Sequence, residues 1–278
     1  MKVVLFCGGQ GTRLRDYSET IPKPMVHIGY RPILWNIMKY YAHFGHKDFI
    51  LALGYKADMI KDYFVNYDET ISNDFVFSKG GKAIELLSSD IDDWRITFVD
   101  TGIQSNIGMR LMRVQEHLQG EEMFLANYAD GLSNLYLPDM IEHFTAQPDK
   151  VGSFMTYQPT ASFHVVRMRK DGLVTNIAPI ANSNLWLNTG YFLFKQEIFD
   201  YMKYGEELVV EPFQRLIREQ KLTTYQHKGF WQSMDTFKDK MLLDDLQERG
   251  DTPWEVWKAV NEPKMQPLYD SPAVRNGQ

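Results

Sequence analysis

The sequence predicts an α/β fold: a Rossmann-like, mainly parallel sheet flanked by helices, followed by a smaller antiparallel portion. Three observations support this prediction. An apolar run at residues 3–6 is typical of a buried strand and leads directly into a glycine-rich turn. Short apolar runs then alternate with helical periodicity, which is typical of right-handed βαβ units. Later segments alternate apolar and polar residues, as antiparallel strands do.

The first half of the chain supplies the alternating elements. Pro32 stands where a helix would start, and apolar residues recur at helical spacing from there to Gly45. Residues 67–92 show weak periodicity, which indicates an inserted hairpin or flap. Ligands of parallel sheets bind beyond the carboxyl ends of the strands, so the loops after the strands are the candidate site. We expect strands at residues 3–6, 49–53, 96–99 and 122–126, and helices at residues 33–45, 59–64 and 111–118.

The second half has a different pattern. Lys170-Asp171-Gly172 is a hairpin turn between two alternating segments. We expect strands at residues 151–157, 164–169 and 173–177, and helices at residues 196–203, at 211–219 and up to about residue 249. We predict one domain over residues 1–258, with halves at 1–135 and 136–258, and an extended or disordered tail at 259–278.

Composition and charge exclude several classes of protein. The chain has 278 residues, of which 44% are apolar and 14% aromatic, as in globular proteins and unlike disordered ones. A net charge of −6 argues against a general nucleic-acid surface but allows a local cationic pocket. Cys7 is the single cysteine, which excludes an internal disulfide and a CxxC metal site.

The distribution of apolar residues gives an expectation for location. No apolar run approaches 18 residues, the length typical of a membrane-spanning helix. The N-terminus begins directly in a predicted strand, which argues against a signal peptide. We therefore expect a cytoplasmic protein that contacts no membrane.

The most informative motif follows the first strand. It reads Gly-Gly-Gln-Gly-Thr-Arg-Leu at residues 8–14 and is followed by Pro-Lys-Pro-Met at residues 22–25. A glycine turn lets backbone N–H groups approach phosphate oxygens, and Arg13 and Lys23 add two cations. A P-loop is excluded because no Gly-Lys-Ser/Thr follows, and Leu14 stands where a dinucleotide-binding motif needs its third glycine. The motif therefore predicts a site for a phosphorylated ligand, although a plain tight turn is the alternative for the glycines alone.

Two aspartates are candidates for metal chemistry. Asp130 follows a predicted strand and precedes a glycine, and Asp235 lies in an aromatic-rich segment. Each alone could be a surface residue at a turn. Two carboxylates together with a substrate phosphate would make a Mg²⁺ site, because Mg²⁺ takes few protein oxygens and completes its shell with phosphates and water. Such a site would orient in-line attack, with Arg13 and Lys23 offsetting the developing charge.

Several further stretches carry a family resemblance over about residues 1–258. Besides the two motifs above, they are Pro-Ile-Leu-Trp at residues 32–35, Val-Asp-Thr-Gly at 99–102, Arg-Leu at 110–111, Tyr-Ala-Asp-Gly at 128–131, Gly-Phe-Trp-Gln at 229–232 and Met-Asp-Thr at 234–236. The chain resembles the glucose-1-phosphate cytidylyltransferase branch of the sugar-nucleotide pyrophosphorylases. The Asp-Thr-Gly and Phe-Trp-Gln segments in particular are specific to this branch.

The resemblance implies an enzyme with a nucleotide-diphospho-sugar transferase fold. It would transfer CMP from CTP to a phosphorylated acceptor, a sugar 1-phosphate or a related phosphate or phosphonate, and release pyrophosphate. A homo-oligomer is expected, with Mg²⁺ as cofactor and no nucleic acid as partner. Arg13 and Lys23 would be catalytic, and Asp130 and Asp235 would hold the metal. The nucleotide contacts implied are Phe6, Gly8, Gly9, Gln10, Gly11, Thr12, Ser105, Arg110 and Ala129.

The chain departs from this branch mainly in the acceptor half. Residues 177–180 read Ile-Ala-Pro-Ile where the branch carries Glu-Lys-Pro, so the lysine expected to hold the sugar phosphate is missing. His164 stands where the branch has a glycine against the sugar, and Asn188 keeps the expected Asn-x-Gly. Arg167 and Arg169 either form a solvated face or supply the missing cation. We therefore predict His164, Arg167, Arg169 and Asn188 as acceptor-binding residues, and glucose 1-phosphate as a poor acceptor.

Ala129 is a smaller departure, because the branch usually has glycine there. One alternative to an enzyme is a non-catalytic, nucleotide-binding regulatory protein that keeps the fold. The presence of Arg13, Lys23, Asp130 and Asp235 favours the enzyme, since a protein that only binds nucleotide has no evident need for all four.

Overall fold

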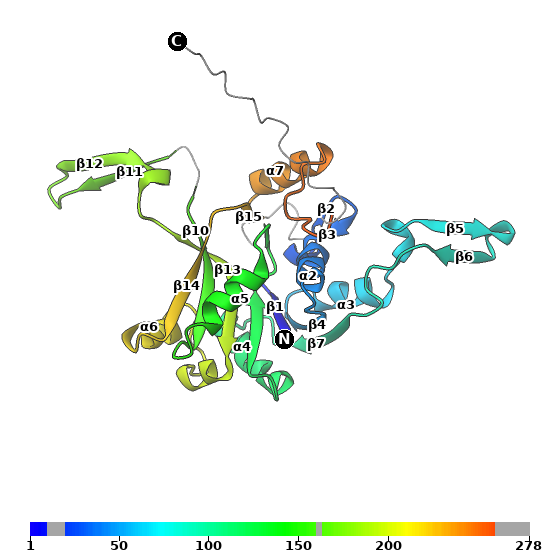
Figure 1. Cartoon of the computed structure of the whole chain (residues 1–278), viewed down its shortest axis with the longest axis horizontal. Helices are drawn as coiled ribbons and strands as arrows, with labels where there is room; N and C mark the ends of the chain where they lie inside the picture. Colours follow the sequence, from blue (N-terminus) through cyan, green and yellow to red (C-terminus); the bar gives the residue numbers. More distant parts are fainter. Residues whose placement is uncertain (10–19, 160–162, 259–278) are drawn as a thin grey trace, which may run out of the picture.

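A computed structural model describes residues 1–9, 20–159 and 163–258 of the chain. Its centre is a seven-stranded sheet in the order β14-β10-β13-β8-β1-β4-β7, shown in Figure 1. The strands are β1 (Val3–Cys7), β4 (Asp48–Leu53), β7 (Arg95–Asp100), β8 (Met123–Asn127), β10 (Gly152–Tyr157), β13 (Leu187–Lys195) and β14 (Leu222–His227). Strands from both predicted halves thus belong to one sheet, because β13 pairs with β8.

Most neighbouring strands of this sheet run parallel. β1 pairs in parallel with β4 and with β8, in a register that places Leu5 beside Leu51 and beside Asn127. β4 with β7, and β10 with β14, are also parallel, whereas β13 runs antiparallel to both of its neighbours. The predicted fold class, a mainly parallel sheet with smaller antiparallel sheets, is confirmed.

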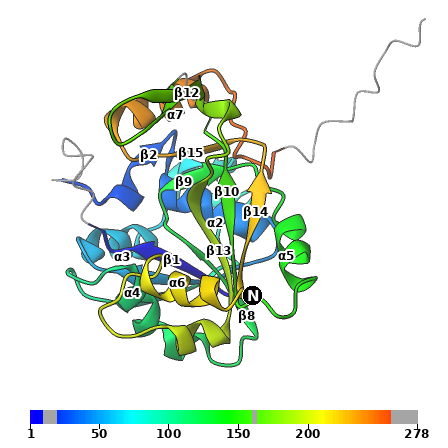
Figure 2. The same ribbon diagram turned by 90° about the vertical axis from the view of Figure 1, so that its left-hand side faces the viewer.

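Helices cover both faces of the sheet because β1 is apolar on both sides. Its alternate residues Val3, Leu5 and Cys7 belong to one apolar core, together with side chains of α2 (Ile33–His43), α3 (Ala57–Val65) and α5 (Leu137–Thr145). Val4 and Phe6 belong to the other core, with α4 (Ile107–Arg113) and α6 (Glu211–Arg218). Figure 2 shows α4 and α6 at one end of the molecule, with α7 (Phe237–Glu248) at the opposite end.

Most predicted elements appear within a few residues of their expected bounds, but the helix at residues 111–118 was placed wrongly. The α-helix there is α4, and a separate 3₁₀ turn, η5 (Gln115–Leu118), follows it. The physical reason is the cap: the side-chain oxygen of Asn106 accepts the backbone N–H of Met109 at 2.8 Å, which starts the helix before the predicted start at Leu111. The helix expected at residues 196–203 is the 3₁₀ helix η7 (Gln196–Tyr201).

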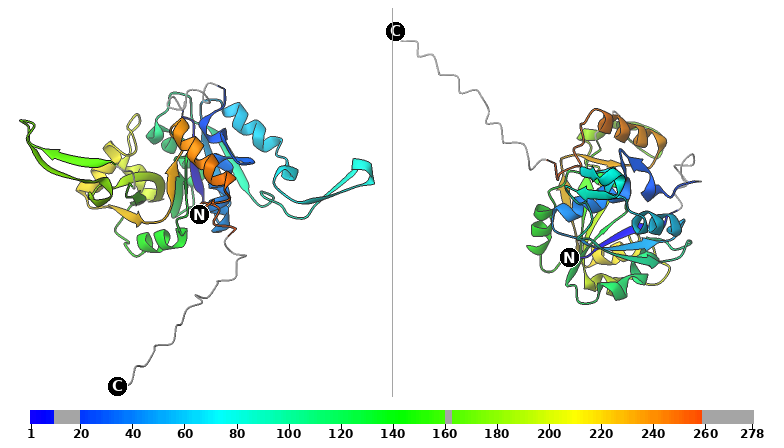
Figure 3. Two further views of the ribbon diagram at one scale, coloured as in Figure 1. Left: turned by 90° about the horizontal axis from the view of Figure 1, so that it is seen from above. Right: turned by 90° about the vertical axis from the view of Figure 1, so that its right-hand side faces the viewer.

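Two hairpins project from the body on opposite sides (Figures 1 and 3). β5 (Phe75–Ser78) and β6 (Ala83–Leu86) form one of them, inside the predicted insertion. β11 (His164–Met168) and β12 (Val174–Pro179) form the other, around the predicted turn, in which Asp171 accepts the N–H of Leu173 at 3.1 Å.

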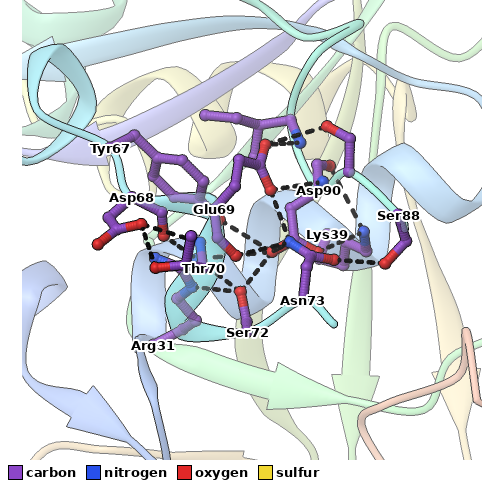
Figure 4. Close-up of polar contacts among 12 residues, drawn as sticks. Arg31, Lys39, Tyr67, Asp68, Glu69, Thr70, Ser72, Asn73, Ser88 and Asp90 are labelled. Carbon is purple, nitrogen blue, oxygen red and sulfur yellow. Dashed lines mark hydrogen bonds and ion pairs between the residues drawn. The ribbon is translucent and has the colours of Figure 1, made fainter. Parts of the chain in front are cut away.

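A polar network around Asp90 anchors the base of the β5–β6 hairpin (Figure 4). The carboxylate of Asp90 accepts hydrogen bonds from Lys39 at 3.2 Å and from Tyr67 at 3.1 Å. Ser72 and Asn73 also donate to it, and the guanidinium of Arg31 lies 3.6 Å away. The network joins α2 of the body to the insertion.

Short paired strands complete the end of the molecule that carries α7 in Figure 1. They are β2 (His27–Ile28) with β3 (Arg31–Pro32), and β9 (Gly131–Ser133) with β15 (Trp231–Ser233). Over residues 1–9, 20–159 and 163–258, no helix has both the length and the apolar character needed to cross a membrane. The predicted tail at residues 259–278 lies outside the described residues, and the domain division stays a prediction.

Candidate active site

A cavity of about 330 Å³ opens at the carboxyl ends of β1 and β8. Residues predicted from several separate motifs meet in its wall, because the carboxyl ends of parallel strands lie at one edge of a sheet. The described lining residues are Phe6, Gly9, Lys23, Pro24, Ser105, Asn106, Ile107, Arg110, Tyr128, Ala129, Asp130, Glu207 and Asp235.

Lys23, Asp130 and Asp235 form the polar centre of this wall. The ammonium of Lys23 donates to Oδ2 of Asp130 and to Oδ1 of Asp235, each at 2.7 Å. The two aspartates lie close together because β9 and β15 pair directly beside them, with Gly131 opposite Ser233. The N–H of Met234 also donates to the carbonyl of Asp130 at 2.8 Å. A backbone pairing thus sets the distance between the two carboxylates.

Local structure also fixes each member of this group. Lys23 begins the 3₁₀ turn η2 (Lys23–Met25), directly after Pro22. Asp235 precedes α7, where the side chain of Asp239 accepts the N–H of Asp235 at 3.2 Å and forms a capping box with Thr236. The helix cap therefore orients the backbone that carries Asp235.

The charges of the group act on Lys23. Burial lowers the pKa of this ammonium, but the nearby carboxylates of Asp130 and Asp235 raise it by more, so the net shift is upward. Lys23 therefore stays protonated throughout the physiological range, as a cation within the cavity.

Arg110 ties together the loops that form another side of the cavity. Its buried guanidinium donates to the carbonyl of Leu53 at 3.0 Å, the hydroxyl of Thr101 at 2.6 Å and the carbonyl of Gly8 at 2.9 Å. Gly8 follows β1, Leu53 is the last residue of β4, and Thr101 follows β7. A Cβ at Gly8 would lie 1.9 Å from this guanidinium, so a larger residue there would displace Arg110 from these hydrogen bonds.

The remaining predicted nucleotide residues lie nearby. Ser105 donates its hydroxyl to the carbonyl of Thr101, and the Phe6 ring lies 6.3 Å from the Tyr128 ring. Ala129 is buried with a left-handed φ of 61°, a conformation that glycine adopts more easily. Gln10, Gly11, Thr12 and Arg13 lie outside the described residues.

The predicted acceptor residues are not among the described residues that line this cavity. His164 and Arg167 lie on β11, and Arg169 follows it; all three are largely exposed on the projecting hairpin. Asn188 lies near the start of β13, where its side chain accepts the N–H of Gly190 at 3.0 Å and lowers the pKa of Tyr128, which does line the cavity, against the larger upward effect of burial.

Sequence reasoning missed five lining residues: Pro24, Asn106, Ile107, Tyr128 and Glu207. Asn106 had a readable signal, since asparagine is a common helix cap. Glu207 had no such signal in the sequence, because it comes from a loop before α6, in the second half of the chain. Burial raises the pKa of its carboxyl group.

The donor set suits a small divalent cation completed by a substrate. Among the described residues, no three His, Cys, Asp or Glu side chains gather as a metal site. Two carboxylates that face the ammonium of Lys23 fit Mg²⁺, which typically takes one or two carboxylates and leaves its other positions to phosphate and water.

Comparisons with known proteins agree with this geometry. The sequence pattern of the nucleotidyl transferase family matches residues 2–243. A glucose-1-phosphate cytidylyltransferase of Salmonella typhimurium is 36% identical over 259 residues, which cover 93% of this chain and 100% of that protein.

Solved structures share the fold. UTP-bound UGPase from Acinetobacter baumannii aligns with a TM-score of 0.65 at 16% identity, over 93% of this chain and 96% of that one. HddC from Yersinia pseudotuberculosis aligns with a TM-score of 0.62 at 19% identity, over 88% of this chain and 98% of that one. The two sequence matches show that the chain belongs to the nucleotidyl transferase family.

Proposed function

We propose that the protein is a Mg²⁺-dependent cytidylyltransferase that transfers CMP from CTP to a phosphorylated acceptor and releases pyrophosphate. The observation that carries the proposal is the placement of Lys23 between Asp130 and Asp235, in a cavity at the carboxyl edge of the sheet. The cytidylyltransferase from Salmonella, similar over nearly the whole chain, supports the choice of reaction.

Asp130 and Asp235 would hold the magnesium ion. When bound, the ion would neutralise substrate phosphates and favour in-line attack at phosphorus. Lys23 would place a second positive charge against the phosphate oxygens, and Arg13 a third. The backbone pairing beside the two aspartates would keep their carboxylates at a fixed separation, so that little reorganisation is needed when substrate arrives.

The wall formed by Phe6, Gly9, Ser105, Arg110 and Ala129 would receive the nucleoside. The hydrogen bonds of Arg110 to the protein hold the loops after β1, β4 and β7 in place, and so shape this side of the pocket. The preference for CTP over other triphosphates follows from the resemblance to the cytidylyl branch, in which the loops at residues 8–10 and 101–110 are implicated in pyrimidine recognition.

The acceptor side would differ from that of the relatives. His164, Arg167, Arg169 and Asn188 are the proposed acceptor-binding residues, and the chain lacks a lysine at residues 177–180. Loss of one charge-assisted contact to phosphate lowers kcat/KM about ten- to hundredfold if nothing replaces it. We therefore propose that the acceptor is a phosphate or phosphonate other than glucose 1-phosphate. A homo-oligomer and a cytoplasmic location stay predictions.

One assay tests the reaction and both substrates. Pyrophosphate release is measured with Mg²⁺ for CTP, UTP, ATP and GTP, each against a panel of sugar 1-phosphates and smaller phosphates and phosphonates. We expect turnover with CTP, none after addition of a chelator, and low kcat/KM with glucose 1-phosphate. A thermal-shift comparison should show the largest stabilisation with CTP.

The same measurements can overturn each part. Equal thermal shifts for all four triphosphates would contradict the proposed preference for CTP. Binding of CTP without pyrophosphate release for any acceptor would favour the regulatory alternative. A kcat/KM with glucose 1-phosphate equal to that of a dedicated glucose-1-phosphate cytidylyltransferase would remove the acceptor proposal.

A further inference from the structure

Lys23 occupies the space between the two proposed metal ligands. Its ammonium lies 2.7 Å from a carboxylate oxygen of Asp130 and 2.7 Å from one of Asp235, and its side chain is only 12% exposed. These residues are 107 and 212 positions away from Lys23 in the sequence, so their meeting is a product of the fold. One compact cation thus bridges both acids.

The charges of the cavity wall determine how a triphosphate would interact with Lys23. Among the described lining residues, Lys23 and Arg110 are cationic, while Asp130, Glu207 and Asp235 are acidic. Arg110 donates to four protein oxygens and anchors the loops. Within the described wall, a polyanionic triphosphate therefore meets more acids than cations, and Lys23 is the cation that it could recruit.

An ammonium and a divalent ion cannot bridge the same carboxylate oxygens together. Mg²⁺ binds oxygen at about 2.0–2.1 Å, which would bring it close to an ammonium already hydrogen-bonded to those oxygens. The two cations would repel strongly at that separation in a partly buried site. Only one of them can bridge Oδ2 of Asp130 and Oδ1 of Asp235 at a time.

We propose that Lys23 and the divalent ion exchange places when nucleotide binds. Without nucleotide, Lys23 keeps the two carboxylates paired and excludes the metal. Phosphate oxygens of the incoming triphosphate draw the ammonium of Lys23 away, and the ion that accompanies the nucleotide then takes its place between the two carboxylates. This inference rests on the proposed metal-dependent function, and it adds an order: metal binds with the triphosphate and not before it.

Binding of Mn²⁺ in the absence of nucleotide tests the exchange without reference to activity. Free Mn²⁺ is followed by electron paramagnetic resonance during titration of wild type, Lys23→Met, Lys23→Arg and the exposed control Lys82→Met. We expect Lys23→Met to bind Mn²⁺ about tenfold more tightly than wild type or better, because the competing charge is gone. Lys23→Arg and Lys82→Met should bind as weakly as wild type.

Further variants guard against a folding artefact and locate the ion. Lys23→Gln keeps the polar side chain without its charge and should also bind Mn²⁺ more tightly than wild type. Adding Asp130→Asn to Lys23→Met should remove the gain. Circular dichroism establishes that each variant is folded. Folded Lys23→Met and Lys23→Gln that bind Mn²⁺ no more tightly than wild type would overturn the exchange.

Titration with the Mn²⁺–CTP complex separates this failure from failure of the proposed function. Wild type should bind the complex, and Asp130→Asn should bind it weakly. Suppose that wild type binds the Mn²⁺–CTP complex, but Lys23→Met binds Mn²⁺ alone no more tightly than wild type does. Then the exchange is wrong and the proposed function stands. If neither wild type nor Lys23→Met binds Mn²⁺, with or without CTP, the metal site itself is wrong.

Discussion

The cavity wall and the β11–β12 hairpin differ in how strongly the fold constrains them. In the wall, Lys23 and Arg110 are buried or nearly so, and each bridges segments distant in the sequence. On the hairpin, His164 and Arg167 are largely exposed on a two-stranded ribbon that projects from the body. Replacing a wall residue leaves a buried polar group without its partner, whereas an exposed side chain can change freely. The departures from the cytidylyl branch fall mainly in the region where substitution costs least.

The largest effect is expected from substitutions at the charged centre of the cavity wall. Asp130→Ala and Asp235→Ala should each lower turnover about 10³-fold or more, because each removes a proposed ligand of the ion that stabilises transition-state charge. Pyrophosphate release and circular dichroism give activity and folding. Asp171→Ala, which removes a carboxylate from the β11–β12 turn, is the matched control and should stay within a few-fold of wild type. Near-normal turnover in either wall variant would contradict the role of that aspartate as a metal ligand.

A smaller effect is expected from the hairpin. The double variant Arg167→Ala/Arg169→Ala should lower kcat/KM for the phosphorylated acceptor about ten- to hundredfold, because a charge-assisted contact to phosphate is lost. The KM for CTP should remain within about twofold. Lys79→Ala/Lys82→Ala removes two cations from the opposite hairpin and should leave both constants unchanged. An unchanged kcat/KM in the arginine variant would show that these arginines form a solvated face.

The smallest expected effect concerns the base of the β5–β6 hairpin. Asp90→Asn should reduce the free energy of unfolding by about 2 kcal/mol, because the carboxylate that accepts from Lys39, Tyr67 and Ser72 loses its charge. Urea denaturation at pH 7 measures the change. Asp93→Asn, which removes an exposed partner of Lys47, should cost less than about 1 kcal/mol.

The pH dependence of this difference has a definite sign. Burial raises the pKa of Asp90, but hydrogen bonds from Ser72 and the charge of Lys39 lower it by more, so the net pKa lies below its ordinary value. The contribution to stability is then fully present above the unfolded-state pKa of about 4 and is lost as the pH falls through the folded-state value. The gap between wild type and Asp90→Asn should therefore begin to shrink as the pH falls below about 4. A gap that stays constant down to pH 2 would contradict the role of the charge.

Local sequence signals predicted most of the secondary structure. The all-apolar run at residues 3–6 is the buried central strand β1, and the helical spacing after Pro32 is α2. The signal failed at residues 111–118, because this run covers only the last part of α4 and continues into the separate turn η5. Asn106, outside that run, decides where the helix begins, since its side chain satisfies a free N–H of the first turn.

For the site, the sequence by itself determined which residue types were present, and it placed Asp130 at the end of a strand. Periodicity and turn motifs are local, so they identified Lys23, Asp130 and Asp235 as separate candidates. Only the tertiary structure decided that these three meet, that Arg110 bonds to three loops, and that Glu207 enters the cavity. The contacts of Lys23, and those of Arg110 with Gly8 and Leu53, join residues far apart in the chain. Strand register and the packing of whole elements set such distances, and no local pattern encodes them.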